Sequence, residues 1–271
     1  MIALSDGNLI VEVYEVGAYV AAVYDVTGVE WVIKGDPSRP TKAGMAFLAP
    51  YANRVKGASY EFEGVRYELP RNSEGHAIHG LLLTEPFEVE DMDERRVVLR
   101  TTLRHRGYPT ELLVKVKYEV MGSLRATAAF TNVGKRNAPL VVGWHPYFAV
   151  VGRWRLIPEG AALRCESENK IPTGRLLPYS FGKDGEYDDC FLIQSGHVEL
   201  KSELGVTSIK SDNMKFFQVY TGVKGAVAVE PMSGAPDAFH NGLGLVIIRP
   251  DETREFSFEV AFTPSRSPPR T

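Results

Sequence analysis

The sequence predicts an all-β protein, a large antiparallel β-sandwich, and three observations lead to that prediction. Apolar and polar residues alternate with a period of two in several segments, most clearly in Val114–Val120 and Phe256–Phe262, and such alternation is typical of half-buried strands. No stretch carries a convincing helical stripe of apolar residues longer than about three turns. The 25 glycines and 17 prolines are spread through the 271 residues, as expected when many strands need many turns.

The predicted strands follow one another without intervening helices, which favours a sandwich over an α/β fold. Tyr60 and Phe62 alternate with acidic residues and a second alternating run begins at Val65, so a hairpin is expected with its turn at Glu63-Gly64. The other expected strands are, in order, Leu9–Glu15, Arg96–Leu103, Leu112–Val120, Leu124–Thr131, Val198–Lys201, Phe216–Tyr220, Leu245–Arg249 and Phe256–Phe262. We expect one domain over residues 1–263 and a disordered tail over residues 264–271.

The composition excludes several classes of partner. The net charge of −3 gives no electrostatic reason to expect nucleic acid binding. Apolar stretches are interrupted well short of a membrane span, and the first six residues lack the features of a signal peptide. A cytoplasmic protein without membrane contact is therefore expected. Two cysteines, Cys165 and Cys190, cannot form a dense disulfide framework, and their spacing matches no metal knuckle.

Glu230 is the most informative residue in the chain. It follows an apolar run, Gly225–Val229, and precedes Pro231. Burial of a carboxylate is costly unless the group is paired or neutralised. Such burial raises the carboxyl pKa towards the range that suits a general acid or base. The alternative interpretation is a structural carboxylate bonded to a nearby loop.

His145 stands in a matching context, because it ends the apolar run Pro139–Trp144 and precedes Pro146. Two strands are therefore expected to deliver one titratable group each and then to stop at a proline. Imidazole and carboxylate are the usual pair for proton transfer near neutral pH. A hydrogen-bonded core histidine is the alternative for His145.

Further polar residues lie in segments that read as loops. His76 and His79 follow the predicted hairpin in a glycine-flanked segment, and loops often carry binding groups. Asn53-Arg54 offers planar donors for hydroxyls or a carboxylate, and Asp188 opens an Asp-Asp-Cys-Phe segment. Exposed histidines, a solvated arginine and an ordinary aspartate turn are the structural alternatives.

Hydroxyl-reading side chains mixed with aromatic ones suit a sugar, which has a polar edge and an apolar face. The aromatic candidates are Trp144, Tyr147, Phe191 and Phe239. His79, His145 and Glu230 would also form the two-histidine, one-carboxylate set of a metal site. Against a metal site, no pair of them lies at the short spacing of a local ligand motif.

Taken together, the motifs resemble those of the aldose 1-epimerase (galactose mutarotase-like) family. They are, in order, Ala49–Arg54, Asn72–Gly80, Gly107–Pro109, His145–Phe148, Asp188–Phe191, and Glu230-Pro231 followed by Pro236–Phe239. The strand pattern extends the resemblance over nearly the whole chain. The resemblance implies a galactose mutarotase-like supersandwich with a sugar-binding groove on its concave face. It also implies an isomerase that needs no metal or organic cofactor.

The resemblance further implies residue roles. Glu230 would take the proton from the anomeric hydroxyl, His145 would protonate the ring oxygen, and His79 would hydrogen-bond near that oxygen. The ring would open to an aldehyde, rotate about C1–C2 and reclose as the other anomer. The residues expected to bind the sugar are Arg54, Asn53, Asp188, Tyr147 and His76.

Three alternatives stay open. A hexose-6-phosphate epimerase of the same superfamily would need a basic cluster at the groove rim, to which Arg66 or Arg71 would contribute. A non-catalytic carbohydrate-binding protein would need Arg54 and the aromatic residues but no Glu–His pair. A metal-dependent isomerase or hydrolase would carry stoichiometric metal. The expected partner is a small-molecule sugar, and the chain is expected to act as a monomer or homodimer.

Overall fold

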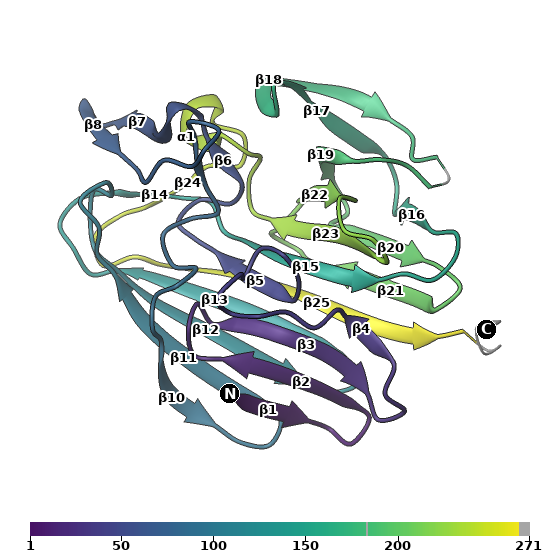
Figure 1. Cartoon of the computed structure of the whole chain (residues 1–271). Coiled ribbons are helices and arrows are strands. Elements are labelled where there is room, and N and C mark those ends of the chain that lie inside the picture. Colours follow the sequence, from purple (N-terminus) through teal and green to yellow (C-terminus); the bar gives the residue numbers. More distant parts are fainter. Residues whose placement is uncertain (183, 266–271) are drawn as a thin grey trace.

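The structure, a computed structural model, describes residues 1–182 and 184–265. It is built almost entirely from antiparallel strands, most of them in two large sheets that face each other (Figure 1). The predicted all-β class is therefore confirmed. The longest α-helix in the described part has four residues, α1 (Ala238–Asn241), and no helix there is long and apolar enough to cross a membrane.

The larger sheet has 11 strands and supplies most of the elements that matter for the site. Its order is β1 (Ile2–Ser5), β2 (Leu9–Tyr14), β3 (Tyr19–Asp25), β4 (Glu30–Val32), β15 (Gly143–Ala149), β23 (Ala226–Met232), β22 (Phe216–Tyr220), β19 (Asp188–Ile193), β17 (Ala162–Glu168) and β18 (Ile171–Tyr179), with β5 (Met45–Leu48) paired to β15 and β3.

The second sheet has eight strands and lies behind the first. Its order is β10 (Glu88–Met92), β11 (Arg96–Leu103), β12 (Leu112–Val120), β13 (Leu124–Asn132), β25 (Thr253–Pro264), β21 (Gly205–Lys210), β20 (His197–Lys201) and β16 (Arg155–Pro158). Three two-stranded ribbons complete the fold: β6 (Arg54–Val55) with β9 (Ala77–Ile78), β7 (Ser59–Phe62) with β8 (Val65–Glu68), and β14 (Ala138–Leu140) with β24 (Val246–Ile248). A 3₁₀ turn, η1 (Lys56–Ala58), links β6 to β7.

Aromatic side chains join the two sheets. Trp144 of β15 packs on Phe258 of β25, with 5.2 Å between the ring centroids. Its indole nitrogen donates a hydrogen bond to the hydroxyl of Tyr118 on β12, 3.0 Å away. Burial of large apolar side chains of this kind is the dominant favourable term in folding. These contacts hold β15, a central strand of the large sheet, against the second sheet.

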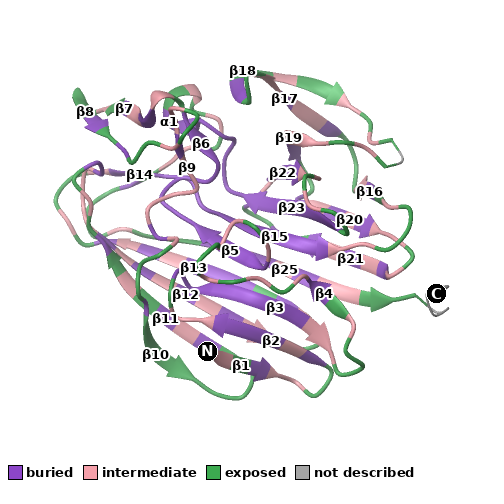
Figure 2. Cartoon of the chain, viewed as in Figure 1, coloured by how far each residue is buried: buried purple, intermediate pink, exposed green. Residues whose placement is uncertain are grey.

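The two large sheets differ in how far their strands are buried. In β12 burial alternates along the strand, whereas all seven residues of β23 are buried (Figure 2). On one face of β23, Glu230 lines a pocket together with Arg54 of β6, Ile78 of β9 and the adjoining His79. Side chains on this face are therefore removed from solvent even when they are polar.

Most of the predicted strands are present. β11 and β22 have the predicted bounds, and the hairpin turns at Glu63-Gly64 between β7 and β8. β25 extends through Pro264, and residues 266–271, which make up most of the predicted tail, lie outside the described residues. One prediction was wrong: His145 and Glu230 do not end their strands, because β15 and β23 continue through Pro146 and Pro231. Proline is compatible with a strand wherever the ladder does not need its N–H.

Candidate active site

His145 and Glu230 face each other across two neighbouring strands. β15 and β23 are antiparallel and pair Gly143 with Met232 and Tyr147 with Ala228, so the same register sets His145 opposite Glu230. Side chains of directly opposed residues lie on the same face of a sheet. The His145 Nε2 atom lies 3.3 Å from Glu230 Oε1. The sequence linked the two residues only through the similar context of their apolar runs. In the structure, the register of β15 and β23 brings them together.

The polar row continues into the next two strands. Gln218 of β22 is paired with Glu230, and Cys190 of β19 is paired with Gln218. Asp188 lies two residues before Cys190 and therefore points to the same face. Its Oδ1 atom accepts a hydrogen bond from Gln218 Nε2 at 3.0 Å. Gln218 is 3% exposed, and the sequence analysis did not select it, because an isolated glutamine in an apolar strand carries no motif.

Two short strands bring Arg54 and His79 over this row. Arg54 of β6 is paired with Ile78 of β9, and the His79 backbone N–H donates to the Asn53 carbonyl at 2.9 Å. Asn53 and His79 both have left-handed backbone conformations, with φ of 57° and 62°. Gly80 allows this close packing, because a Cβ atom there would lie 2.2 Å from the Ala49 carbonyl oxygen.

The loop that contains Pro236–Phe239 supports Arg54 from behind. The Asp237 N–H donates to the Arg54 carbonyl at 2.7 Å, and Asp237 Oδ1 accepts a hydrogen bond from the Lys56 N–H at 2.8 Å. His240 contacts the same carboxylate oxygen at 2.6 Å. This contact raises the pKa of the His240 imidazole, against the opposing effect of burial. The loop therefore has a structural role in fixing β6.

His145, Glu230, Asp188, Arg54 and His79 line one pocket of about 320 Å³. Its described lining consists of Thr41, Lys42, Asn53, Arg54, Glu74, Ile78, His79, His145, Tyr147, Lys170, Asp188, Tyr220 and Glu230. Seven of the eight residues that the sequence singled out are in this set. His76 is not in it: its Nδ1 atom accepts a hydrogen bond from the Gly57 N–H at 3.0 Å, so the ring holds the loop instead.

The aromatic residues are distributed differently from the expectation. Tyr147 lines the pocket, and its hydroxyl donates to the Thr41 carbonyl at 2.8 Å. Trp144 and Phe191 are fully buried in the core, and Phe239 packs on Tyr60 at 4.7 Å between ring centroids. The expectation that all four aromatic residues would face a sugar was therefore wrong for three of them. Alternation along a strand sends Trp144 and His145 to opposite faces.

Three buried polar atoms of residues that line the pocket have no hydrogen-bond partner within the described part of the chain. They are Nδ1 of His79, Nδ1 of His145 and Oε2 of Glu230. Each such group costs about 1–3 kcal/mol when it is buried and unsatisfied. Most buried polar groups in native proteins are paired, so three orphans among the residues of one pocket indicate a site that a polar ligand completes.

Burial shifts the pKa values of the two facing groups in opposite directions. Desolvation, with a further contribution from the Asp188 charge, raises the pKa of Glu230 well above its usual range. Desolvation lowers the pKa of His145 to about 4. His79 is also shifted well below its ordinary pKa, first by burial and then by the charge of His145. Near neutral pH a single proton shared by the pair is therefore favoured on Glu230 in the empty pocket.

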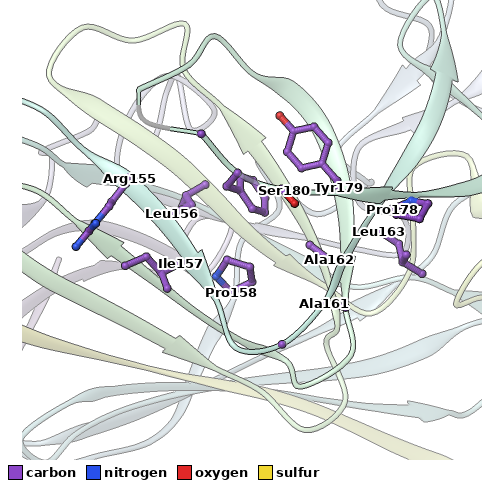
Figure 3. Close-up of a pocket in the computed structure, with 13 residues that line it drawn as sticks. Arg155, Leu156, Ile157, Pro158, Ala161, Ala162, Leu163, Pro178, Tyr179 and Ser180 are labelled. Atoms are coloured by element: carbon purple, nitrogen blue, oxygen red, sulfur yellow. The ribbon is translucent and has the colours of Figure 1, made fainter.

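A larger hollow of about 860 Å³ lies elsewhere, between β16, β17 and β18 (Figure 3). Apolar residues such as Leu156, Ile157 and Leu163 line it, and its titratable residues within the described ranges are Arg155 and Tyr179. It lacks a facing acid and base, so it does not offer the chemistry of the smaller pocket. Across residues 1–182 and 184–265, no group of three or more His, Cys, Asp or Glu residues is arranged to hold a metal ion.

The sequence comparison decides the family. The family model for aldose 1-epimerase matches residues 1–261. The chain belongs to the aldose 1-epimerase family.

Relatives of this aldose 1-epimerase family member cover nearly its full length. YihR of Escherichia coli K12, an uncharacterized protein, is 27% identical over 290 aligned positions, which cover 96% of this chain and 92% of YihR. A GalM/aldose epimerase homologue from C. elegans superimposes with a TM-score of 0.85 at 19% identity, covering 97% of this chain and 98% of that one. A galactose 1-epimerase from Lactobacillus acidophilus gives 0.80 at 16% identity, with coverages of 97% and 93%. At these identities the solved structures establish the galactose mutarotase-like fold.

Proposed function

We propose that the protein is a mutarotase, an isomerase that interconverts the α- and β-anomers of a free aldose in the pocket around His145 and Glu230. One observation carries the proposal. A buried carboxyl and a buried imidazole lie 3.3 Å apart, with side chains that are 1% and 6% exposed, and each has one buried polar atom without a hydrogen-bond partner among the described residues. Family membership supports the same reaction class.

Mutarotation moves one proton off the anomeric oxygen and places one on the ring oxygen. Glu230 takes the proton of the anomeric hydroxyl, the bond between C1 and the ring oxygen breaks, and His145 gives a proton to the ring oxygen. The open aldehyde rotates about C1–C2. Ring closure on the other face returns the proton from Glu230 to the new anomeric oxygen, and His145 regains its proton. Each such group contributes about 10²–10⁴-fold to the rate.

The reaction requires the pair to hold one transferable proton. In the empty pocket the shifts favour that proton on Glu230. Hydrogen bonds to the ionised form of a carboxyl lower its pKa, so donation from bound sugar hydroxyls to Glu230 reduces the cost of moving the proton to His145. Because the roles reverse on reclosure, a pair with nearly balanced proton affinities in the complex suits both half-reactions.

The remaining polar residues are suited to hold the sugar. His79, which lines the pocket, is suited to bind near the ring oxygen or a neighbouring hydroxyl, since the His79 and His145 rings lie 5.3 Å apart and edge-on. Arg54, which is 7% exposed, and Asp188 bind hydroxyls on the other side. Tyr147 stacks on His145 with 4.7 Å between ring centroids and fixes the imidazole plane.

A hexose 6-phosphate is the second candidate substrate, and Lys42 favours it. Lys42 lines the pocket, and no ion pair to it is found among the described residues. Its ammonium is therefore available to an anionic substituent. Arg66 and Arg71, which the sequence suggested for this purpose, do not line the pocket: Arg66 pairs with Glu68 at 2.8 Å, and Arg71 donates to the Gly57 carbonyl at 3.0 Å.

A mutarotation assay across a panel of aldoses tests both candidates. Freshly dissolved α-anomers of glucose, galactose, xylose, arabinose and hexose 6-phosphates are followed by polarimetry or NMR with and without protein. We expect acceleration of at least one free aldose, and its loss in Glu230→Gln. No acceleration of any sugar by the wild-type protein, or wild-type rates in Glu230→Gln, would contradict the proposal.

Two rivals are separated in the same preparation. A carbohydrate-binding protein without catalysis would bind a sugar of the panel, as seen by NMR line broadening, and leave its anomerisation rate unchanged. A metal-dependent isomerase would contain stoichiometric zinc, iron or manganese by elemental analysis and lose activity after chelation. For a mutarotase, activity is expected to survive chelation.

A further inference from the structure

Lys170 reaches the pocket from an unexpected element, the turn of the hairpin β17–β18. This hairpin is the last element of the large sheet (Figure 1). Its register pairs Glu168 with Ile171, so Asn169 and Lys170 form a two-residue turn. Lys170 is nevertheless one of the residues that line the pocket. Neither motif nor strand pattern selects it in the sequence.

The Lys170 ammonium lies between two carboxylates at the pocket rim. Its Nζ atom is 3.0 Å from Asp188 Oδ2 and 4.0 Å from Glu74 Oε1. Glu74 in turn pairs with Arg54, whose Nε and Nη2 atoms both lie 3.0 Å from Glu74 Oε2. Charges of alternating sign thus run from Arg54 through Glu74 and Lys170 to Asp188. This row of charges links four separate segments: β6, the loop before β9, the turn between β17 and β18, and β19.

Asp188 is held from both sides by this arrangement. Gln218 of the neighbouring strand β22 donates to Oδ1 at 3.0 Å, and Lys170 of the β17–β18 turn pairs with Oδ2 at 3.0 Å. Charge-assisted contacts of this kind are shorter and stronger than neutral ones. Both carboxylate oxygens therefore have a fixed direction. A carboxylate whose orientation is set before the ligand arrives loses less freedom on binding.

The backbone conformation of the turn does not favour a lysine at position 170. Asn169 and Lys170 have φ values of 50° and 67°, which is the left-handed pair of a type I′ hairpin turn. Such turns favour asparagine followed by glycine, because glycine adopts positive φ without a steric penalty. Lysine at the second position is the less favourable choice for the backbone. A compensating contact of its side chain accounts for it, and the described contacts are those with Asp188 and Glu74.

We propose that Lys170 is a positioning residue that orients Asp188 and thereby sets the affinity of the pocket for the hydroxyls of its sugar. This inference rests on the mutarotase function proposed above. Lys170 acts through Asp188, away from the facing His145–Glu230 pair. Interactions that are equally strong in the ground state and in the transition state change KM and leave kcat unaltered. The hairpin turn is thus a determinant of sugar affinity whose ion pairs are with Asp188 and Glu74 and not with the His145–Glu230 pair.

The substitution Lys170→Gly separates the turn from the side chain, because it creates the preferred Asn-Gly turn while removing the ammonium. For the best aldose of the panel we expect KM to rise about tenfold with kcat within about threefold of wild type. The thermal midpoint is expected to stay the same or to rise. Lys170→Arg retains the charge and is expected to restore most of the affinity. Glu63→Gly is the matched control, since Glu63 has φ of 51° in the turn of another hairpin, outside the pocket lining.

Three outcomes would overturn the inference. A wild-type KM in Lys170→Gly would show that Asp188 does not need the lysine. A fall in kcat as large as the rise in KM would place Lys170 in the chemistry instead. A lowered thermal midpoint together with failure of Lys170→Arg to restore KM would make its role structural. A wild-type protein that accelerates no aldose removes the proposed function and this inference with it, whereas an active wild type with an unaffected Lys170→Gly removes only the inference.

Discussion

β12 and β23 are both inner strands of their sheets, and they treat charge in opposite ways. In β12 the charged residues alternate with the core residues and find partners outside: Lys115 pairs with Glu90 at 2.7 Å, and Lys117 with Glu119 at 2.8 Å. In β23 every residue is buried, and one oxygen of Glu230 has no hydrogen-bond partner among residues 1–182 and 184–265. The surface charges of β12 are thus ion-paired, whereas the buried carboxyl of Glu230 is only partly hydrogen-bonded within the described residues.

This difference distinguishes charged groups that stabilise the fold from buried groups that are suited to bind a ligand. Solvent-exposed ion pairs such as Lys117–Glu119 contribute about 0–1 kcal/mol to stability. An unsatisfied buried group instead destabilises the fold, and functional sites commonly carry such costs. Substitutions of His145 on β15 and Glu230 on β23 are therefore expected to reduce activity while leaving the fold intact or more stable. Substitutions of the surface charges on β12 are expected to change neither activity nor stability appreciably.

The largest expected effect is that of His145→Asn. Asparagine keeps a polar side chain of smaller size at the buried position but cannot exchange a proton near neutral pH. We expect the enzymatic rate of mutarotation to fall by about 10²–10⁴-fold, while sugar binding, measured by NMR titration, persists. Full activity in this variant would remove His145 as a proton donor. Loss of both binding and activity would show that the imidazole is needed to hold the sugar.

Several strands with one face towards solvent could be predicted from the sequence, although β10 and β21, which also have solvent-facing residues, were not. β11, β12 and β22 were found because alternation or apolar runs mark them. β3 and β5 carry no such mark, because successive residues are buried on both faces and the period of two disappears. The same loss of period led to the wrong endings for β15 and β23 at Pro146 and Pro231. Double-sided burial hides strands from a periodicity test.

Only those site residues that stand in recognisable sequence motifs could be predicted. His79, His145 and Glu230 stand in recognisable segments, and the structure brings all three to one pocket. Gln218, Glu74 and Lys170 were missed, because each reaches the site through strand register or a turn. The only sequence signal for Lys170 is its place after Asn169, where an Asn-Gly turn would be more usual. Such contacts depend on segments far apart along the chain, which no local pattern encodes.

A second prediction concerns pH. With two protons on the His145–Glu230 pair, Glu230 cannot accept the anomeric proton, so activity is lost as pH falls through the lower pKa of the pair. Burial lowers the pKa of His145 to about 4. The enzymatic kcat/KM, corrected for uncatalysed mutarotation, is therefore expected to be nearly constant between pH 7 and pH 5. It should fall by about tenfold per pH unit only below about pH 4. An acid limb near pH 6.5 would contradict the inferred burial of the imidazole.

The smallest expected effect is on stability, and it tests the comparison of β23 with β12 directly. Burial raises the pKa of Glu230 in the folded protein above its unfolded value of 4.5. Below pH 4.5 both states hold the proton and no penalty exists. As pH rises above 4.5 the unfolded state ionises and the folded state does not, so the folded state loses stability relative to the unfolded one until the raised pKa is reached.

Glu230→Gln removes this penalty because glutamine has no charge to desolvate. The variant is expected to have a higher thermal midpoint than wild type at pH 7.5, by about 2–4 °C for each kcal/mol gained, and an unchanged midpoint at pH 4. Glu119→Gln on β12 is the matched control. Its partner Lys117 is 37% exposed, so we expect a change of less than about 0.5 kcal/mol at either pH. Equal responses of the two variants would mean that β23 holds its carboxyl no differently from β12.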